Sequence, residues 1–192
     1  MTVLASDDGL ARCSWVGNDE EYRRYHDEEW GFPLHGDRAL FEKLSLEGFQ
    51  AGLSWITILR RRPSFREVFH NFELADVAAM TPGDADVLMN DARIIRNRAK
   101  IEATISNAHV ALELTAEHPG ALDELIWSFA PPKRSSRPND LAQLPAVTAE
   151  STALSAALRA RGFCFVGPTT MYALMQSAGL VDDHVVACWR ST

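Results

Sequence analysis

Residues 161–172 read RGFCFVGPTTMY, and this stretch decides the fold of the 192-residue chain. Helical sequence stops at its start, a short loop carries a Gly-Pro pair at Gly167, and Thr169 and Thr170 begin a new helix. Backbone N–H groups at such a loop and at the following helix N-terminus point outward and favour an anion such as a phosphate. The stretch predicts a helix–hairpin–helix element at about residues 151–180, an element that can hold a nucleic-acid backbone without recognising its sequence.

Helical signals also dominate the rest of the chain. Asp37 is a candidate N-cap for a segment over residues 37–62 whose apolar side chains recur at helical spacing. Thr81 followed by Pro82 is a strong helix start, and residues 94–118 form a long amphipathic segment. Because no segment alternates in the manner of a strand, the sequence predicts an all-α fold.

The chain is expected to form a single domain. Residues 131–147 contain four prolines and predict a loop, which we interpret as a connection within the domain. A helix follows, with Thr148 or Ser151 as its cap. The domain is expected over residues 11–192, and residues 1–10 are expected to be a dispensable N-terminal extension.

Composition places the protein among soluble globular proteins, with 46% hydrophobic and 23% charged residues. Three cysteines cannot form a disulfide framework, which favours a reducing compartment. The N-terminus lacks the basic start and apolar block of a signal peptide, and no apolar run approaches membrane-spanning length. We expect a cytoplasmic protein without a membrane partner, and a monomer is the simplest assembly.

The net charge of −7 argues mildly against nucleic acid as a partner. The acids are concentrated in residues 1–50, which carry 11 acidic and 5 basic side chains, whereas residues 51–192 carry 15 and 14. Charge alone leaves two interpretations open, a local nucleic-acid surface or solvated helix faces. The basic side chains of the second part cluster at Arg60, Arg61 and Arg62, at Arg93, Arg96, Arg98 and Lys100, and at Lys133, Arg134 and Arg137.

Residues near the two ends of the chain make a candidate metal site. His184 and Cys188 are four apart, which places them on one face of a helix, and Cys13 and His26 are the best candidates for further ligands. Two thiolates and two imidazoles form a closed tetrahedral set that suits structural zinc, with no open position for a catalytic water. The alternative is that the cysteines are buried and His184 only forms a hydrogen bond.

A second constellation combines aromatic rings with a carboxylate. Trp15, Tyr22, Tyr25 and Trp30 lie in one short segment, and Glu47 falls on an otherwise apolar helix face. A carboxylate there is costly unless it is paired or used. Aromatic faces with one carboxylate suit a flat cationic ligand such as an alkylated purine. Core aromatics and an exposed Glu47 are the plain alternative.

Several motifs, in chain order, carry a family resemblance: RCSW, YHDEEWG, LEGFQAGLSW, IIRNRAKI, RGFCFVGPTTMY, MQSAGL and DHVVAC. Together they resemble the DNA-3-methyladenine glycosylase I family, bacterial enzymes that repair alkylated DNA. The likeness runs from about Arg12 to Cys188. It implies a helix–hairpin–helix glycosylase fold with a structural zinc that joins the N- and C-terminal segments.

The resemblance also implies roles for individual residues. Glu47 would contact the exocyclic amine and ring edge of the extruded base. The base pocket would be formed by Trp15, Tyr22, Tyr25, Trp30 and Trp55. The DNA would be contacted by Gly52, Leu53, Gly167, Thr169 and Thr170. The zinc ligands would be Cys13, His26, His184 and Cys188.

The implied activity is base-excision repair of double-stranded DNA: hydrolysis of the N-glycosidic bond of flipped-out 3-methyladenine, which leaves an abasic site. No lyase step is implied. Asp182 occupies the position of the superfamily's catalytic acid and is expected either to assist departure of the base or, as we favour, to cap the last helix. Two other classes stay open, a DNA-binding module without catalysis and a zinc-dependent hydrolase.

Overall fold

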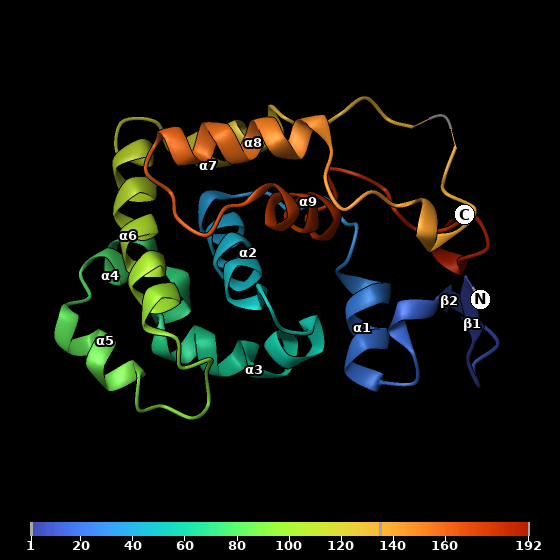
Figure 1. The fold of residues 1–192 in the computed structure, drawn as a ribbon, viewed down its shortest axis with the longest axis horizontal. Helices are drawn as coiled ribbons and strands as arrows, with labels where there is room; N and C mark the ends of the chain where they lie inside the picture. Colours follow the sequence, from blue (N-terminus) through green and yellow to red (C-terminus); the bar gives the residue numbers. More distant parts are fainter. Residues whose placement is uncertain (1, 135, 192) are drawn as a thin grey trace.

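The computed structural model of the protein describes residues 2–134 and 136–191, which form helices and one small β-hairpin (Figure 1). None of the described helices has the length and apolar content needed to cross a membrane. Short 3₁₀ turns lie at Ser14–Val16, His70–Phe72, Leu141–Gln143 and Trp189–Ser191. The strands and α-helices are β1 (Val3–Ala5), β2 (Ala11–Cys13), α1 (Glu20–Glu28), α2 (Asp37–Gln50), α3 (Trp55–Val68), α4 (Leu74–Ala78), α5 (Pro82–Leu88), α6 (Arg98–Thr115), α7 (Ala121–Trp127), α8 (Ala149–Ala160) and α9 (Pro168–Ser177).

The fold is mostly helical as expected, but β1 and β2 were not predicted. They pair antiparallel, with Val3 opposite Cys13 and Ala5 opposite Ala11. Each strand has three residues, which is too short to show an alternating pattern in the sequence. Residues 1–10, expected to be an extension, therefore contribute a strand that pairs with the strand carrying Cys13.

Helix α2 lies at the centre of the molecule, in contact with α3, α6, α7 and α9. Residues 40–49 of this helix are all buried, including Glu42, Lys43 and Glu47. A helix covered on every side needs no single apolar stripe, which is why its charged residues occupy interior positions. Its apolar side chains Phe41, Leu44 and Phe49 belong to the main hydrophobic core.

The segment over residues 37–62, expected to run as one helical stretch, is divided into α2 and α3. The turn between them contains Gly52 with φ +84°, a conformation that glycine adopts without a steric cost. The ammonium of Lys100 on α6 donates to the carbonyl oxygen of Ala51 at 2.6 Å and stabilises the turn. This division exposes the α2–α3 turn at the surface.

Of the three N-caps predicted from the sequence, two are confirmed by the structure. Thr81 caps α5 and Thr148 caps α8, each accepting a hydrogen bond from the third helical residue. The expectation for Asp37 was wrong, because Gly36 is the N-cap of α2. The carboxylate of Asp37 instead accepts backbone N–H groups at the start of α7, so it caps a helix distant in sequence.

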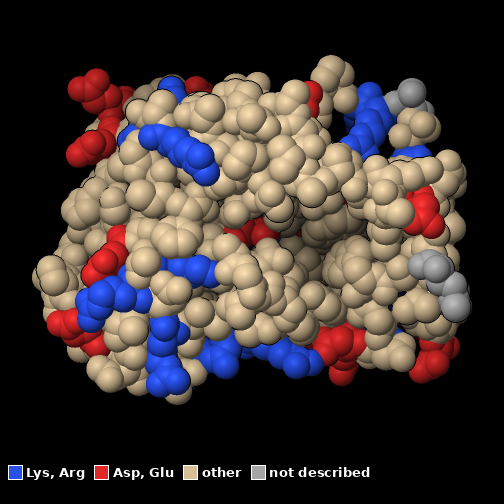
Figure 2. Space-filling model, in the orientation of Figure 1, with Lys and Arg blue, Asp and Glu red and all other residues tan. Residues whose placement is uncertain are grey.

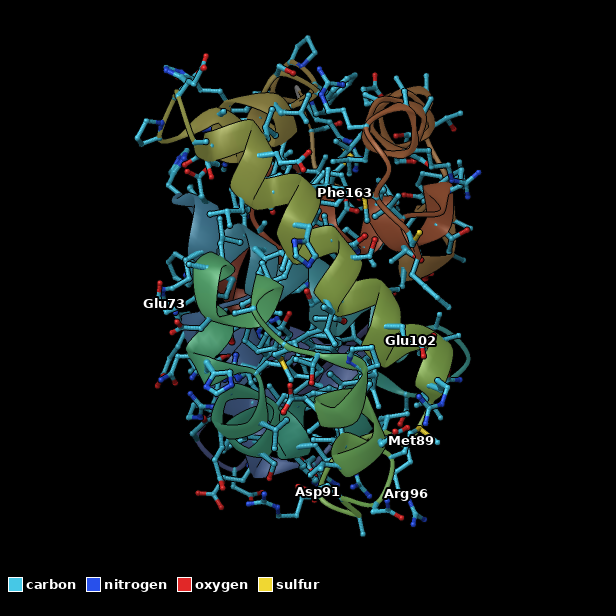
Figure 3. All side chains as sticks on the ribbon, turned by 90° about the vertical axis from the view of Figure 1, so that its left-hand side faces the viewer. Glu73, Met89, Asp91, Arg96, Glu102 and Phe163 are labelled. Atoms are coloured by element: carbon cyan, nitrogen blue, oxygen red, sulfur yellow. The ribbon has the colours of Figure 1, made fainter. Side chains whose placement is uncertain are left out.

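Helices α8 and α9 pack against each other and form the predicted helix–hairpin–helix element. Gly162 ends the first helix with φ +98°, and Gly167 is the N-cap of α9. The predicted helix at 94–118 is shorter, starting at Arg98 after its cap Asn97. Figure 3 shows α6 crossing the side of the molecule away from the chain ends, with Glu102 near its start.

The prediction that His184 and Cys188 share one face of a helix was wrong. Residues 182–185 are irregular and residues 186–187 form a turn, closed by the backbone N–H of Cys188, which donates to the carbonyl oxygen of Val185 at 2.9 Å. The N–H of Val186 donates to the carbonyl oxygen of Pro138, which ties the tail to the proline-rich loop. Both chain ends lie on the same side of the molecule (Figure 1).

Candidate active site and metal centre

A cavity of about 330 Å³ is bounded by α1, α2, α3 and α9. This volume is at the small end of the range for ligand sites. Figure 2 shows a hollow in the middle of the face that is turned toward the viewer, with red acidic atoms at its bottom. The five aromatic residues expected to form a pocket and Glu47 all line this one cavity. The lining residues are Trp15, Tyr22, Tyr25, Trp30, Glu47, Gln50, Ser54, Trp55, Leu144, Ala173, Gln176 and Ser177.

The aromatic wall is held by ring contacts between distant parts of the chain. Trp15 makes edge contacts with Tyr22 and Trp30, with ring centroids 5.4 and 5.2 Å apart. The rings of Tyr25 and Trp55 lie 5.5 Å apart. These contacts join the 3₁₀ turn after β2 to α1 and α3, and they produce flat apolar walls suited to a planar ligand.

Glu47 supplies a charged acceptor within this apolar cavity. Its side chain is 3% exposed, and its Oε1 accepts a hydrogen bond from the hydroxyl of Ser177 at 2.8 Å. Burial raises the pKa of Glu47, while Lys43 one helical turn earlier and the Ser177 hydroxyl lower it. The cavity thus offers a carboxylate whose electrostatic interactions are stronger than they would be in water.

Sequence reasoning missed the contribution of α9 and of Lys43. Gln176 and Ser177 line the cavity from α9, and no local motif indicates which face of that helix turns inward. Lys43 was detectable, because it lies four residues before Glu47 on the same helix. Its ammonium donates to the hydroxyl of Tyr25 at 2.8 Å.

The residues expected to contact DNA lie in two segments, the exposed α2–α3 turn and the half-buried start of α9. Gly52 and Leu53 form the α2–α3 turn, and Gln50 before it and Ser54 after it line the cavity. Leu53 is 41% exposed. Gly167, Thr169 and Thr170 form the N-terminal turn of α9, whose C-terminal part lines the cavity. The α2–α3 turn and helix α9 therefore both connect to the same cavity.

Asp182 and Asp183 have different environments. Asp182 neither caps a helix nor lines the aromatic cavity; its carboxylate accepts from Arg137 at 2.7 Å and from the backbone N–H of His184. Asp183 is buried and accepts hydrogen bonds from Tyr172 and from Arg134, both at 2.7 Å. The helix-cap expectation for Asp182 was wrong because no helix begins at the residues that follow it, and the buried acid is the neighbouring Asp183.

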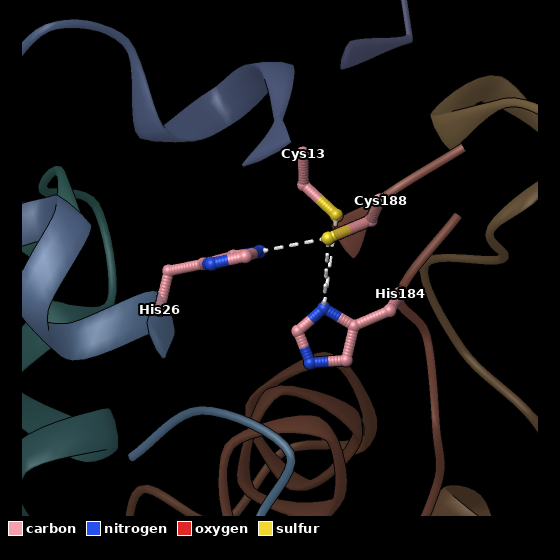
Figure 4. Close-up of side chains that lie close together, drawn as sticks. All are labelled: Cys13, His26, His184 and Cys188. Atoms are coloured by element: carbon pink, nitrogen blue, oxygen red, sulfur yellow. Dashed lines mark hydrogen bonds between the residues drawn. The ribbon is translucent and has the colours of Figure 1, made fainter. Parts of the chain in front are cut away.

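The four predicted ligands Cys13, His26, His184 and Cys188 converge in one buried cluster (Figure 4). The Cys188 sulfur lies 3.4 Å from Nε2 of His26 and 3.7 Å from Nδ1 of His184, and the Cys13 sulfur lies 3.9 Å from the latter atom. Tetrahedral zinc with ordinary bond lengths separates sulfur and nitrogen ligands by about 3.6 Å. The donor atoms thus fit a zinc ion.

A second set of contacts orients these ligands. Nδ1 of His26 lies 2.7 Å from a carboxylate oxygen of Asp27, which leaves Nε2 free to face the cluster. The buried guanidinium of Arg12 holds Asp27, with Nε 2.9 Å from the carboxylate. A hydrogen bond between the two side chains raises the pKa of Cys13 and lowers the pKa of Cys188, which favours a thiolate at Cys188.

The fold and the cavity define a mostly helical protein with a helix–hairpin–helix element and an aromatic pocket that contains one buried carboxylate. The model of the methyladenine glycosylase family matches residues 15–191. DNA-3-methyladenine glycosylase of Haemophilus influenzae is 49% identical over 92% of this chain and 96% of its own length. The chain belongs to the methyladenine glycosylase family.

Solved structures agree with this assignment. A crystal structure of 3-methyladenine DNA glycosylase I superposes with a TM-score of 0.88 and 44% identity, covering 93% of this chain and 98% of the other. A variant of 3-methyladenine DNA glycosylase I, solved in complex with 3-methyladenine, superposes with a TM-score of 0.87 and 35% identity, covering 94% and 97%. The mostly helical fold is therefore shared with these enzymes.

Proposed function

We propose that this protein is a monofunctional DNA glycosylase of base-excision repair, which releases 3-methyladenine from alkylated double-stranded DNA and leaves an abasic site. The observation that carries the proposal is the buried carboxylate of Glu47 in an aromatic cavity of about 330 Å³. Membership of the methyladenine glycosylase family supports the same reaction.

The chemistry of the lesion determines what the protein has to supply. Methylation at N3 puts a positive charge on adenine, which weakens the bond between N9 and C1′ of the sugar. The base leaves with the electron pair of that bond and becomes neutral, while water adds to C1′ and releases a proton. Recognition and extrusion of the damaged base are the main tasks, and extrusion costs a few kcal/mol.

The cavity offers favourable interactions for such a base. Tyr25 and Trp55 provide aromatic faces that stack on or line it, and Glu47 accepts hydrogen bonds from its exocyclic amine. Trp15, Tyr22 and Trp30 complete the wall. An undamaged base carries no positive charge, so it gains less from the carboxylate and the aromatic faces and does not offset the cost of leaving the duplex.

The DNA backbone would be held by the helix–hairpin–helix element. The free N–H groups in the first turn of α9, at Thr169 and Thr170 after Gly167, suit a phosphate. Gly52 and the exposed Leu53 would occupy the gap that the extruded nucleotide leaves in the duplex. We propose that one protein molecule acts on one lesion as a monomer.

A structural zinc ion would be held by Cys13, His26, His184 and Cys188. Two sulfur and two nitrogen donors, all buried and within 4.8 Å of one another, support this assignment. Four protein ligands leave no place for a reacting water. The ion would join the β2 segment and α1 to the tail, and it takes no part in the reaction.

The activity is tested by incubating the protein with methylated DNA and identifying the released bases by chromatography. We expect free 3-methyladenine from the wild-type protein and very little from Glu47→Gln. Release of no alkylated base, with DNA binding equal in both proteins, would instead identify a DNA-binding module without catalysis.

A further inference from the structure

A second cavity of about 650 Å³ shares the lining residue Ser177 with the aromatic cavity, and Lys43 lines it. Lys43 is 7% exposed, and within residues 2–134 and 136–191 it has no carboxylate oxygen at ion-pair distance. Most other charged side chains around this cavity are paired. These pairs are Arg38 with Glu73, Arg62 with Glu29, Arg66 with Glu42, and Glu28 with Arg24.

The nearest polar partner of Lys43 is a residue of the base pocket. Its ammonium lies 2.8 Å from the hydroxyl oxygen of Tyr25, and 4.7 and 4.8 Å from the ring centroids of Tyr25 and Trp55. An ammonium group can only donate, so the Tyr25 oxygen accepts. The hydroxyl hydrogen of Tyr25 must then point away from Lys43.

We propose that Lys43 is a positioning residue of the base pocket, whose ammonium keeps the Tyr25 hydroxyl oriented as a hydrogen-bond donor toward the bound base. The inference rests on the proposed function. Adenine presents an amine donor at N6 beside an acceptor at N7, whereas guanine presents two acceptors along the same edge. An acceptor at Glu47 and a donor at Tyr25 match the adenine pattern. The same pair would place the O6 acceptor of guanine against the Glu47 carboxylate, which is repulsive.

The charges around Lys43 determine the pH range in which this arrangement holds. Burial lowers the pKa of Lys43 to about 8, so its ammonium is present at neutral pH and is lost at higher pH. The charged and titratable groups facing Lys43 are Glu42 and Glu47 of α2, Tyr25 and Glu29 of α1 and its C-cap, and Arg62 of α3.

The test measures the dissociation constant of free 3-methyladenine by calorimetry at pH 7.0 and pH 9.5. The proteins are the wild type, Lys43→Met, Tyr25→Phe and the double variant. Arg66→Met is the matched control, because Arg66 lines the same second cavity, carries the same charge and does not contact Tyr25. Thermal unfolding of each variant checks that it folds.

At pH 7.0 we expect Lys43→Met to bind about tenfold more weakly than the wild type, and Arg66→Met to stay within about twofold. Raising the pH to 9.5 should weaken the wild type toward Lys43→Met and leave Lys43→Met and Tyr25→Phe unchanged. The double variant should bind no more weakly than Tyr25→Phe, because Lys43 acts through that hydroxyl.

Three results would overturn the inference. They are equal binding by Lys43→Met and the wild type, an additional loss in the double variant, and a pH dependence that persists in Tyr25→Phe. The last measurement does not require Lys43→Met to fold. A wild type that neither binds 3-methyladenine nor releases it from methylated DNA would overturn the proposed function as well, which separates the two failures.

Discussion

The aromatic cavity that contains Glu47 and the Cys/His cluster are adjacent but have opposite character. Tyr25 and His26 are consecutive residues of α1, yet Tyr25 faces the cavity and His26 faces the cluster. Trp30 joins the two, since it lines the cavity and its ring lies 4.6 Å from the ring of His184. One short helix therefore supplies both sites.

The difference lies in how each site uses its polar groups. In the cluster, four donor atoms face one another and leave no space for a substrate. In the cavity, Glu47 has one hydrogen-bond partner among the described residues, Ser177, and it lines an open volume. Closed polar sets stabilise a fold, whereas a buried charge held beside empty space is a marker of function. Four predictions test this division, from the largest expected effect to the smallest.

Cys188→Ser should break the cluster without changing the cavity lining. Removing one thiolate ligand is expected to release the zinc and to lower the free energy of unfolding by about 3–5 kcal/mol. Metal content by mass spectrometry and thermal unfolding measure both effects. Cys164→Ser is the control, because Cys164 is exposed and lies outside the cluster. Retention of zinc by Cys188→Ser would show that the ligand set is wrong.

Glu47→Gln should affect the cavity alone. Loss of the carboxylate is expected to slow release of 3-methyladenine from DNA about 100-fold, while zinc content and melting temperature stay at or above wild type. Single-turnover excision assays measure the rate. Glu42→Gln provides the comparison, since Glu42 is buried on the same helix and pairs with Arg66 outside the cavity. A similar loss in both variants would contradict a specific role for Glu47.

Asp27→Asn should lower the zinc affinity of the cluster, by less than Cys188→Ser does. It replaces the carboxylate that holds the His26 ring, and such outer contacts typically change metal affinity about tenfold. Competition with a chelator measures the affinity. Asp8→Asn is the matched change, because Asp8 also pairs with Arg12 but does not contact His26. Equal affinities in the two variants would remove Asp27 from the zinc site.

Lys43→Met should change the pH dependence of stability. The pKa of Lys43 is about 8 when folded and about 10.5 when unfolded, so the unfolded chain binds more protons between these values. Wild-type stability should rise relative to Lys43→Met by on the order of 1 kcal/mol across that window. Urea unfolding at pH 7.5 and pH 10 measures the change. A constant difference between the two proteins would contradict a buried ammonium at residue 43.

Much of the fold was predictable because its signals are local. Thr81, Thr148, Gly162 and Gly167 begin or end helices through contacts within a few residues, so the sequence around each one is sufficient. The N-cap predicted at Asp37 was wrong because a carboxylate in that position can also cap a different helix. In this fold the N-terminus of α7 lies beside it.

The sequence by itself determined the helical signals, the aromatic and carboxylate constellation and the identity of the four Cys/His residues. Only the tertiary structure decided how they are used. The four side chains come from strand β2, helix α1 and the irregular tail rather than from one helix, since packing brings together residues that are distant in sequence. The tertiary structure also placed Lys43 under Tyr25, Ser177 beside Glu47, and the buried charge at Asp183 instead of Asp182. The burial of a side chain and its hydrogen-bond partners depend on the helices and turns packed around it, so a local sequence pattern does not predict them.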